Sequence, residues 1–235
     1  MVTYEQSADK QVVLDFIQRA KDFLRERNLL GEPGAVLYST CETLKQGDYY
    51  FLGVNPAGSG EDNPTTIEDS LDKLGTSEEN EYLDVSWYPD KDDKRRRPLQ
   101  ERFRFLFEDA LGVENPRSIC ASNLIFRSSK KEKDSGRSPM AEKCWPVHEL
   151  IIRDVVRPRV IITHGSLPFD FISHKLGGQL LNVPQDCKHG KWTWRCSRLE
   201  TGQKLIGLPH LSIFAINSSN RTDVVREIVK QIQFD

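Results

Sequence analysis

Three polar side chains in this sequence stand where apolar segments give way to loops. Asn55 follows the apolar residues 49–54, Asn123 lies inside a second apolar segment, and His210 follows a third. An amide carries both a donor and an acceptor, so these asparagines can orient a water molecule or pair with the edge of a heterocyclic ring. A histidine can donate a hydrogen bond to a leaving group in its neutral or its charged form. Side chains of these types can serve a hydrolysis reaction.

Each of these side chains also has a structural interpretation. Asn123 can cap a strand end and bond a loop backbone, and a lone histidine such as His210 is often structural. His164, which closes another apolar segment, is interpreted as structural. The sequence contains no Gly-x-Ser-x-Gly motif and no glycine-rich phosphate-binding motif. A serine hydrolase and a nucleotide-cofactor fold are therefore disfavoured.

The elements that must position these side chains alternate between strands and helices. Apolar periodicity predicts helices near residues 9–28, 66–74, 103–111, 145–156 and 167–176, and from Thr222, taken as a capping residue. Short apolar runs and a hairpin signal predict strands at 49–54, 117–126, 160–163, 191–199 and 204–208. This alternation predicts a three-layer α/β/α fold with a central, mostly parallel sheet. In such sheets the site lies beyond the carboxyl ends of the strands.

The domain organisation follows from the lack of a linker. No Gly/Ser-rich or Pro-rich stretch divides the chain, so residues 1–235 are predicted to form a single domain. The N-terminal helix at about 9–28 precedes the sheet, and residues at about 62–97 form a long polar insertion. Long loops in compact domains are usually functional.

Composition and charge indicate a folded cytoplasmic protein. The chain is 37% hydrophobic and carries a net charge of −2, which argues against a general nucleic-acid coating protein but allows local basic patches. Basic runs at 94–97 and 127–131 are candidates for such patches, and each can equally be a solvated loop. No apolar run is long enough to cross a bilayer, and residues 1–10 lack a signal-peptide pattern.

The five cysteines are an odd number without framework spacing, which predicts reduced thiols. Cys187, His189 and Cys196 offer only three ligands for zinc, so no metal is expected.

Four segments in this order resemble motifs of the uracil-DNA glycosylase superfamily. They are residues 51–58 (FLGVNPAG), Asn123 at the end of the second strand, residues 144–165 (CWPVHEL through VRPRVIITHG), and residues 208–212 (LPHLS). The motif order is most similar to the bacterial thermophile-type branch, which Glu61-Asp62 also echoes, and to the mismatch-specific branch.

The sequence departs from the family pattern at several positions. Ala57 is inserted in the first motif, Leu211 replaces the proline that follows the family's histidine, and the insertion has no counterpart in a minimal member. Of the four cysteines that hold an iron–sulfur cluster in the thermophile-type branch, Cys144 alone has a clear match, with Cys41 an uncertain second. The resemblance therefore implies an enzyme without this cluster and without another cofactor.

The resemblance implies a monomeric DNA glycosylase, which hydrolyses the bond between a base and its deoxyribose. The base must be flipped out of the DNA, and a water molecule attacks the sugar without a covalent lysine intermediate. Asn55 would orient the water, and His210 would donate to the departing base. The base would be held by Gly53, Asn123, Ala57 and Gly58.

The same resemblance implies contacts with DNA around these motifs. A residue of the loop after His210 would fill the gap left by the flipped base, with candidates Leu211, Ile213 and Phe214. An aromatic ring for stacking on the base would come from Trp87, Tyr88 or Phe126. The expected DNA-contact residues are Arg127, Lys130, Leu211, Ser212 and Arg221.

The sequence leaves the substrate open. Uracil is the family's usual base, whereas the insertion and the altered first loop favour a roomier pocket for a modified pyrimidine. Such a pocket would suit the hypermodified bases of phage DNA and a role in defence. A further alternative is a non-catalytic nucleic-acid-binding protein, because the first motif has no acidic residue to activate water between positions 53 and 58.

Overall fold

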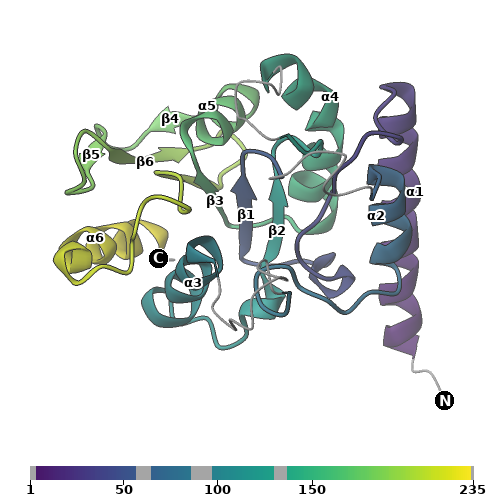
Figure 1. Cartoon of the computed structure of the whole chain (residues 1–235), viewed down its shortest axis with the longest axis horizontal. Coiled ribbons are helices and arrows are strands. Elements are labelled where there is room, and N and C mark those ends of the chain that lie inside the picture. The colour runs from purple at the N-terminus through teal and green to yellow at the C-terminus, as the bar shows by residue number, and fades with distance from the viewer. Residues whose placement is uncertain (1–3, 57–64, 86–96, 130–136, 234–235) are drawn as a thin grey trace. The chain divides into compact units, whose positions relative to one another are not determined.

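The computed structural model describes residues 4–56, 65–85, 97–129 and 137–233 (Figure 1). The chain is an α/β protein whose β-structure is mixed and mostly parallel in its central pairs, with helices flanking the strands. It divides into two compact units, one made of Met1–Glu78 and Ile119–Pro158, the other of Glu79–Ser118 and Arg159–Asp235. The expected single domain and three-layer arrangement stay predictions.

The first unit is built around two parallel strands. Strands β1 (Tyr49–Gly53) and β2 (Cys120–Asn123) pair in register, with Gly53 opposite Asn123. All of β2 and all of β1 beyond its first residue are buried, as expected for strands covered by helices. The remaining elements of this unit are helices α1 (Tyr4–Glu26), α2 (Ile67–Leu74) and α4 (Arg137–Leu150), followed by a π-helical turn at Ile151–Val155.

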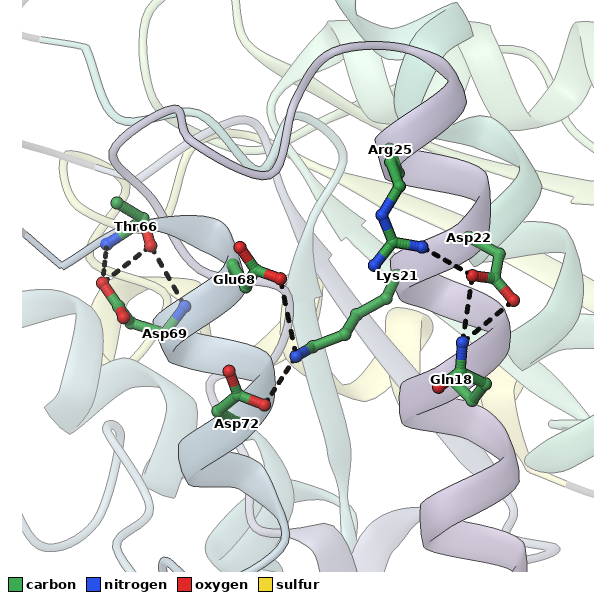
Figure 2. Close-up of polar contacts among 8 residues, drawn as sticks. All are labelled: Gln18, Lys21, Asp22, Arg25, Thr66, Glu68, Asp69 and Asp72. Atoms are coloured by element: carbon green, nitrogen blue, oxygen red, sulfur yellow. Dashed lines mark hydrogen bonds and ion pairs between the residues drawn. The ribbon is translucent and has the colours of Figure 1, made fainter.

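Helices α1 and α2 lie against each other and are joined by a charged cluster (Figure 2). Lys21 of α1 places its ammonium 2.6 Å from Asp72 and 3.7 Å from Glu68, both on α2. The Thr66 side chain accepts from the backbone N–H of Asp69, whose carboxylate accepts in turn from the Thr66 backbone, which forms a capping box. The polar residues around α2 therefore set both its start and its contact with α1.

The second unit contains a mixed sheet. Strands β3 (Val160–His164) and β7 (Lys204–Leu208) are parallel, whereas β6 (Thr193–Arg198) is antiparallel to β7. Two short strands, β4 (Gln179–Leu180) and β5 (Gln185–Asp186), pair antiparallel with β6. The helices are α3 (Pro98–Arg104), continued by a π-helical turn at Phe105–Ala110, α5 (Ser166–Lys175) and α6 (Thr222–Ile232).

The predicted elements are confirmed, with three corrections. The strand predicted at 117–126 is limited to β2, because a 3-10 turn at Pro116–Ser118 precedes it and irregular chain follows. The helix predicted from 145 begins at Arg137 and passes through Pro146. Thr222 is not a capping residue: it is the first residue of α6, and its hydroxyl donates to the Ser219 carbonyl at 2.9 Å.

Candidate functional site

The ends of β1 and β2 bring the predicted base-binding residues of the first unit together. Gly53 pairs with Asn123, and the Gly53 carbonyl accepts from the Leu124 N–H at 2.9 Å. One residue further on, the Val54 carbonyl accepts from the Ile125 N–H at 2.9 Å. The parallel pairing thus continues past both strands and holds Asn55 and Asn123 at the same carboxyl end. This is the edge at which open α/β sheets place ligands.

Asn123 is largely buried, and its side chain forms no hydrogen bond with the described residues. The residue is 6% exposed, and no described residue forms a hydrogen bond with its amide. The structural interpretation, a strand cap bonded to a loop, is therefore not seen in the described part of the chain. Within the described part of the chain, the donor and the acceptor of this amide are therefore not used by the fold.

The Asn55 side chain is half-buried and its orientation is determined by two acceptors. Its Nδ2 donates to the Pro56 carbonyl at 2.9 Å and to the Ser129 hydroxyl at 3.0 Å. Because a carbonyl oxygen only accepts, the NH2 group must face Pro56. The Oδ1 atom therefore lies on the other side of the amide, as an acceptor. Ala57 and Gly58, which were predicted to line the same pocket, lie outside the described residues.

A buried histidine, which was not predicted as a site residue, supports the chain next to Asn123. His148 of α4 receives the Tyr50 hydroxyl at Nδ1 (2.8 Å), and its Nε2 donates to the Leu124 carbonyl at 3.0 Å. The carbonyl can only accept, so the proton is on Nε2, and Tyr50 is the donor. Complete burial lowers the pKa of His148 to about 4, so the ring is neutral at pH 7. A histidine on the apolar face of a predicted helix was the sequence feature that could have indicated this supporting role.

In the second unit, the loop after β7 presents His210 in a defined tautomer. The Ser212 backbone N–H donates to Nδ1 of His210 at 3.3 Å, and the Ser212 hydroxyl lies 2.7 Å from the same atom. An Nδ1 that accepts carries no proton, so the neutral ring holds its proton on Nε2. His210 is half-buried, and its neutral ring carries its donor at Nε2.

His164, at the end of β3, packs edge-on against His210 with ring centroids 4.8 Å apart. Burial, together with repulsion from His210, holds the pKa of His164 well below its usual value. The His164 ring is therefore neutral at pH 7.

The same loop corrects two of the expected DNA contacts. Leu211 is completely buried and Phe214 likewise, whereas Ile213 is 61% exposed. Of the three residues considered for filling the gap in DNA, only Ile213 presents its side chain at the surface. Arg221 is 6% exposed and donates to the Ala215 carbonyl.

Two arginines anchor this loop from within the second unit. Besides Ala215, Arg221 contacts Nδ1 of His189 at 2.8 Å and lies 5.0 Å from the centre of the Phe214 ring. Arg102 of α3 donates to the Leu211 carbonyl at 2.5 Å. Arg221 thus supports the loop rather than offering its charge to DNA.

The remaining candidates are placed as follows. Arg127 is half-buried with its guanidinium 3.9 Å from the Glu32 carboxylate, and Ser212 is exposed. Phe126 is buried and its ring packs 4.8 Å from that of His148, which leaves no face for a base. Lys130, Trp87 and Tyr88 lie outside the described residues.

The described residues contain no group of three or more His, Cys, Asp or Glu side chains that could hold a metal ion. At the zinc candidate, burial raises the pKa of Cys187 to about 12 and raises that of Cys196 as well. The third candidate, His189, contacts the Arg221 guanidinium, a cation that disfavours a metal there.

Comparison with models of known protein families and with curated proteins found no match to this chain. Within the described ranges, no helix is both long and apolar enough to cross a membrane.

Proposed function

We propose that this protein is a DNA glycosylase with the three-layer fold of the uracil-DNA glycosylase superfamily. The observation that carries the proposal is Asn123 at the carboxyl end of β2, a residue that is 6% exposed and whose amide forms no hydrogen bond with the described residues. An amide in this state can pair with both a carbonyl and an N–H group on the edge of a pyrimidine. The order of motifs in the sequence supports the same function.

The proposed mechanism assigns different tasks to the two polar loops. Oδ1 of Asn55 accepts a hydrogen bond from a water molecule. This bond aims a lone pair of the water oxygen at the sugar carbon. The motif order assigns His210 the donation of a hydrogen bond to the carbonyl oxygen of the departing base, where negative charge develops. The bond between the base and the sugar breaks through an oxocarbenium-like state, and the water oxygen bonds the sugar carbon. The proton that the water releases ends on the departing base, which leaves as a neutral molecule. Because an amide is a poor base, the reaction depends on orientation and on leaving-group stabilisation.

The test is mass analysis of free bases released from three DNAs: unmodified, uracil-containing, and phage-derived with hypermodified pyrimidines. Release from uracil DNA alone would identify a repair-type substrate, and release from phage DNA alone would identify a defence substrate. We expect Asn55→Ala and His210→Ala each to lower the single-turnover rate by on the order of 100-fold. The exposed Asn217→Ala serves as the control and should match the wild type.

Two results would refute the proposal. Full base release by Asn55→Ala would exclude the role of that amide. DNA binding by the wild type without release of any base would show a non-catalytic binding protein instead.

A further inference from the structure

Ser129, which follows β2 by six positions, contacts the side chain proposed to orient the attacking water. Its hydroxyl accepts from Nδ2 of Asn55 at 3.0 Å, and its backbone N–H donates to the Pro56 carbonyl at 3.2 Å. The same carbonyl accepts the other Nδ2 hydrogen of Asn55 at 2.9 Å. Ser129 therefore bonds both the Asn55 side chain and the backbone group that anchors it.

These contacts use every donor that the Asn55 amide has. The NH2 group carries two hydrogens, and two acceptors receive them. No described residue donates to Oδ1. The end of the amide that is not bonded to Pro56 and Ser129 therefore carries an acceptor and no donor. Water that donates a hydrogen bond to this acceptor can keep a lone pair aimed at a carbon atom.

We infer that Ser129 is a positioning residue, which gives the Asn55 amide a second anchor beside the Pro56 carbonyl and so holds its oxygen end toward the attacking water. The inference rests on the proposed function. Without the Ser129 hydroxyl, one N–H of Asn55 loses its partner. The amide then keeps a single side-chain anchor, the bond to the Pro56 carbonyl, about which it can swing. A swinging amide no longer holds Oδ1 in one direction, so the water is oriented toward the sugar for less of the time.

The chain offers a matched pair of variants for the test. Ser129→Ala removes the hydroxyl and keeps the backbone bond to Pro56. Ser128→Ala removes the neighbouring hydroxyl, which is buried and has no hydrogen-bond partner in the described part of the chain. Ser129→Thr keeps a hydroxyl at the same position. All three replacements are small, and matching thermal midpoints would show that the folds are equivalent.

The experiment measures base release under single-turnover conditions, with the rate at saturating DNA separated from the DNA concentration that gives half that rate. We expect Ser129→Ala to lower the saturating rate about tenfold, the effect of one lost hydrogen bond, with half-saturation unchanged. Ser129→Thr should restore most of the rate, and Ser128→Ala should match the wild type.

A second background separates positioning from a general structural effect. In Asn55→Asp the side chain has no N–H group to donate to Ser129, so the anchoring bond of the wild type is already absent. Ser129→Ala should then change the saturating rate by less than about twofold.

The outcomes distinguish a failure of the Ser129 inference from a failure of the proposed function. A wild type that releases bases, with Ser129→Ala equally fast, would overturn the inference and leave the proposed function standing. An equal loss in Ser129→Ala and Ser128→Ala would also overturn it, because the effect would then not depend on the bond to Asn55. A wild type that releases no base would overturn the proposed function itself.

Discussion

The buried imidazole of His148 makes the stability of the protein depend on pH in a way that can be isolated. The pKa of His148 is lowered from its usual value of 6.5 to about 4 by burial. Between these two values the unfolded chain binds a proton that the folded chain does not. Acidification therefore stabilises the unfolded state, and the contribution present above pH 6.5 is lost progressively as the pH falls to 4.

The size of the effect follows from the pKa difference. A difference of roughly 2.5 pKa units corresponds to a loss of about 3 kcal/mol in the free energy of unfolding by pH 4. His164 is also buried with a lowered pKa, so the wild-type pH dependence contains both histidines. A variant that removes only one of them is needed to separate the two contributions.

Glutamine at position 148 provides that variant. Its amide can donate to the Leu124 carbonyl and accept from the Tyr50 hydroxyl, which keeps both contacts of the imidazole, and it does not titrate. Urea unfolding of the wild type and of His148→Gln at pH 7, 6, 5 and 4 gives the two stability curves. The curves should converge or cross on acidification, with a relative gain for His148→Gln of about 3 kcal/mol between pH 7 and pH 4. The exposed His174→Gln should keep the wild-type pH dependence. Parallel curves for the wild type and His148→Gln would refute the reasoning.

Three further substitutions test contacts within single units. Gly34→Ala should destabilise the protein by about 2 kcal/mol or more, because a Cβ there would lie 2.0 Å from a backbone carbonyl oxygen, whereas Gly31→Ala, with nothing within 4 Å, should be near neutral in urea unfolding. Lys21→Met should lower stability by about 1 kcal/mol at low salt and by less at high salt, since the two ion pairs to α2 are screened; a salt-independent loss would point to packing instead. Arg221→Met should speed hydrogen exchange around Ala215 without changing exchange in the first unit, and unchanged protection there would show that the arginine does not hold the loop.

The fold class and most elements were predictable from the sequence because their signals are local. The buried runs of β1 and β3 and the apolar face of α6 follow directly from residue spacing. The positions of single side chains were less predictable, because they depend on contacts between distant residues. Leu211 and Arg221 looked suitable for DNA by type, yet both are buried by partners that sequence spacing does not reveal.

The contacts of His148 and Ser129 were not predicted, because they too join residues that lie far apart in the sequence. His148 bonds residues 98 and 24 positions away, and Ser129 bonds a side chain 74 positions away. No local pattern encodes such pairs. The asparagines, in contrast, were selected because they follow apolar strands, where open α/β sheets place their ligands, and their roles stay predictions.

Two polar side chains near the end of β2 differ in their hydrogen bonds. His148 is completely buried and has partners at both ring nitrogens, whereas Asn123 is 6% exposed and its amide forms no hydrogen bond with the described residues. An amide without a protein partner contributes little to the stability of a fold. Asn123→Leu, which has a similar volume and no polar atoms, should therefore keep the free energy of unfolding or raise it by up to about 1 kcal/mol, while base release is lost under the proposed function. Urea unfolding and the base-release assay on the same preparation measure both quantities. A destabilised Asn123→Leu would mean that the amide supports the fold, and the base-binding role of Asn123 would then lose its physical basis.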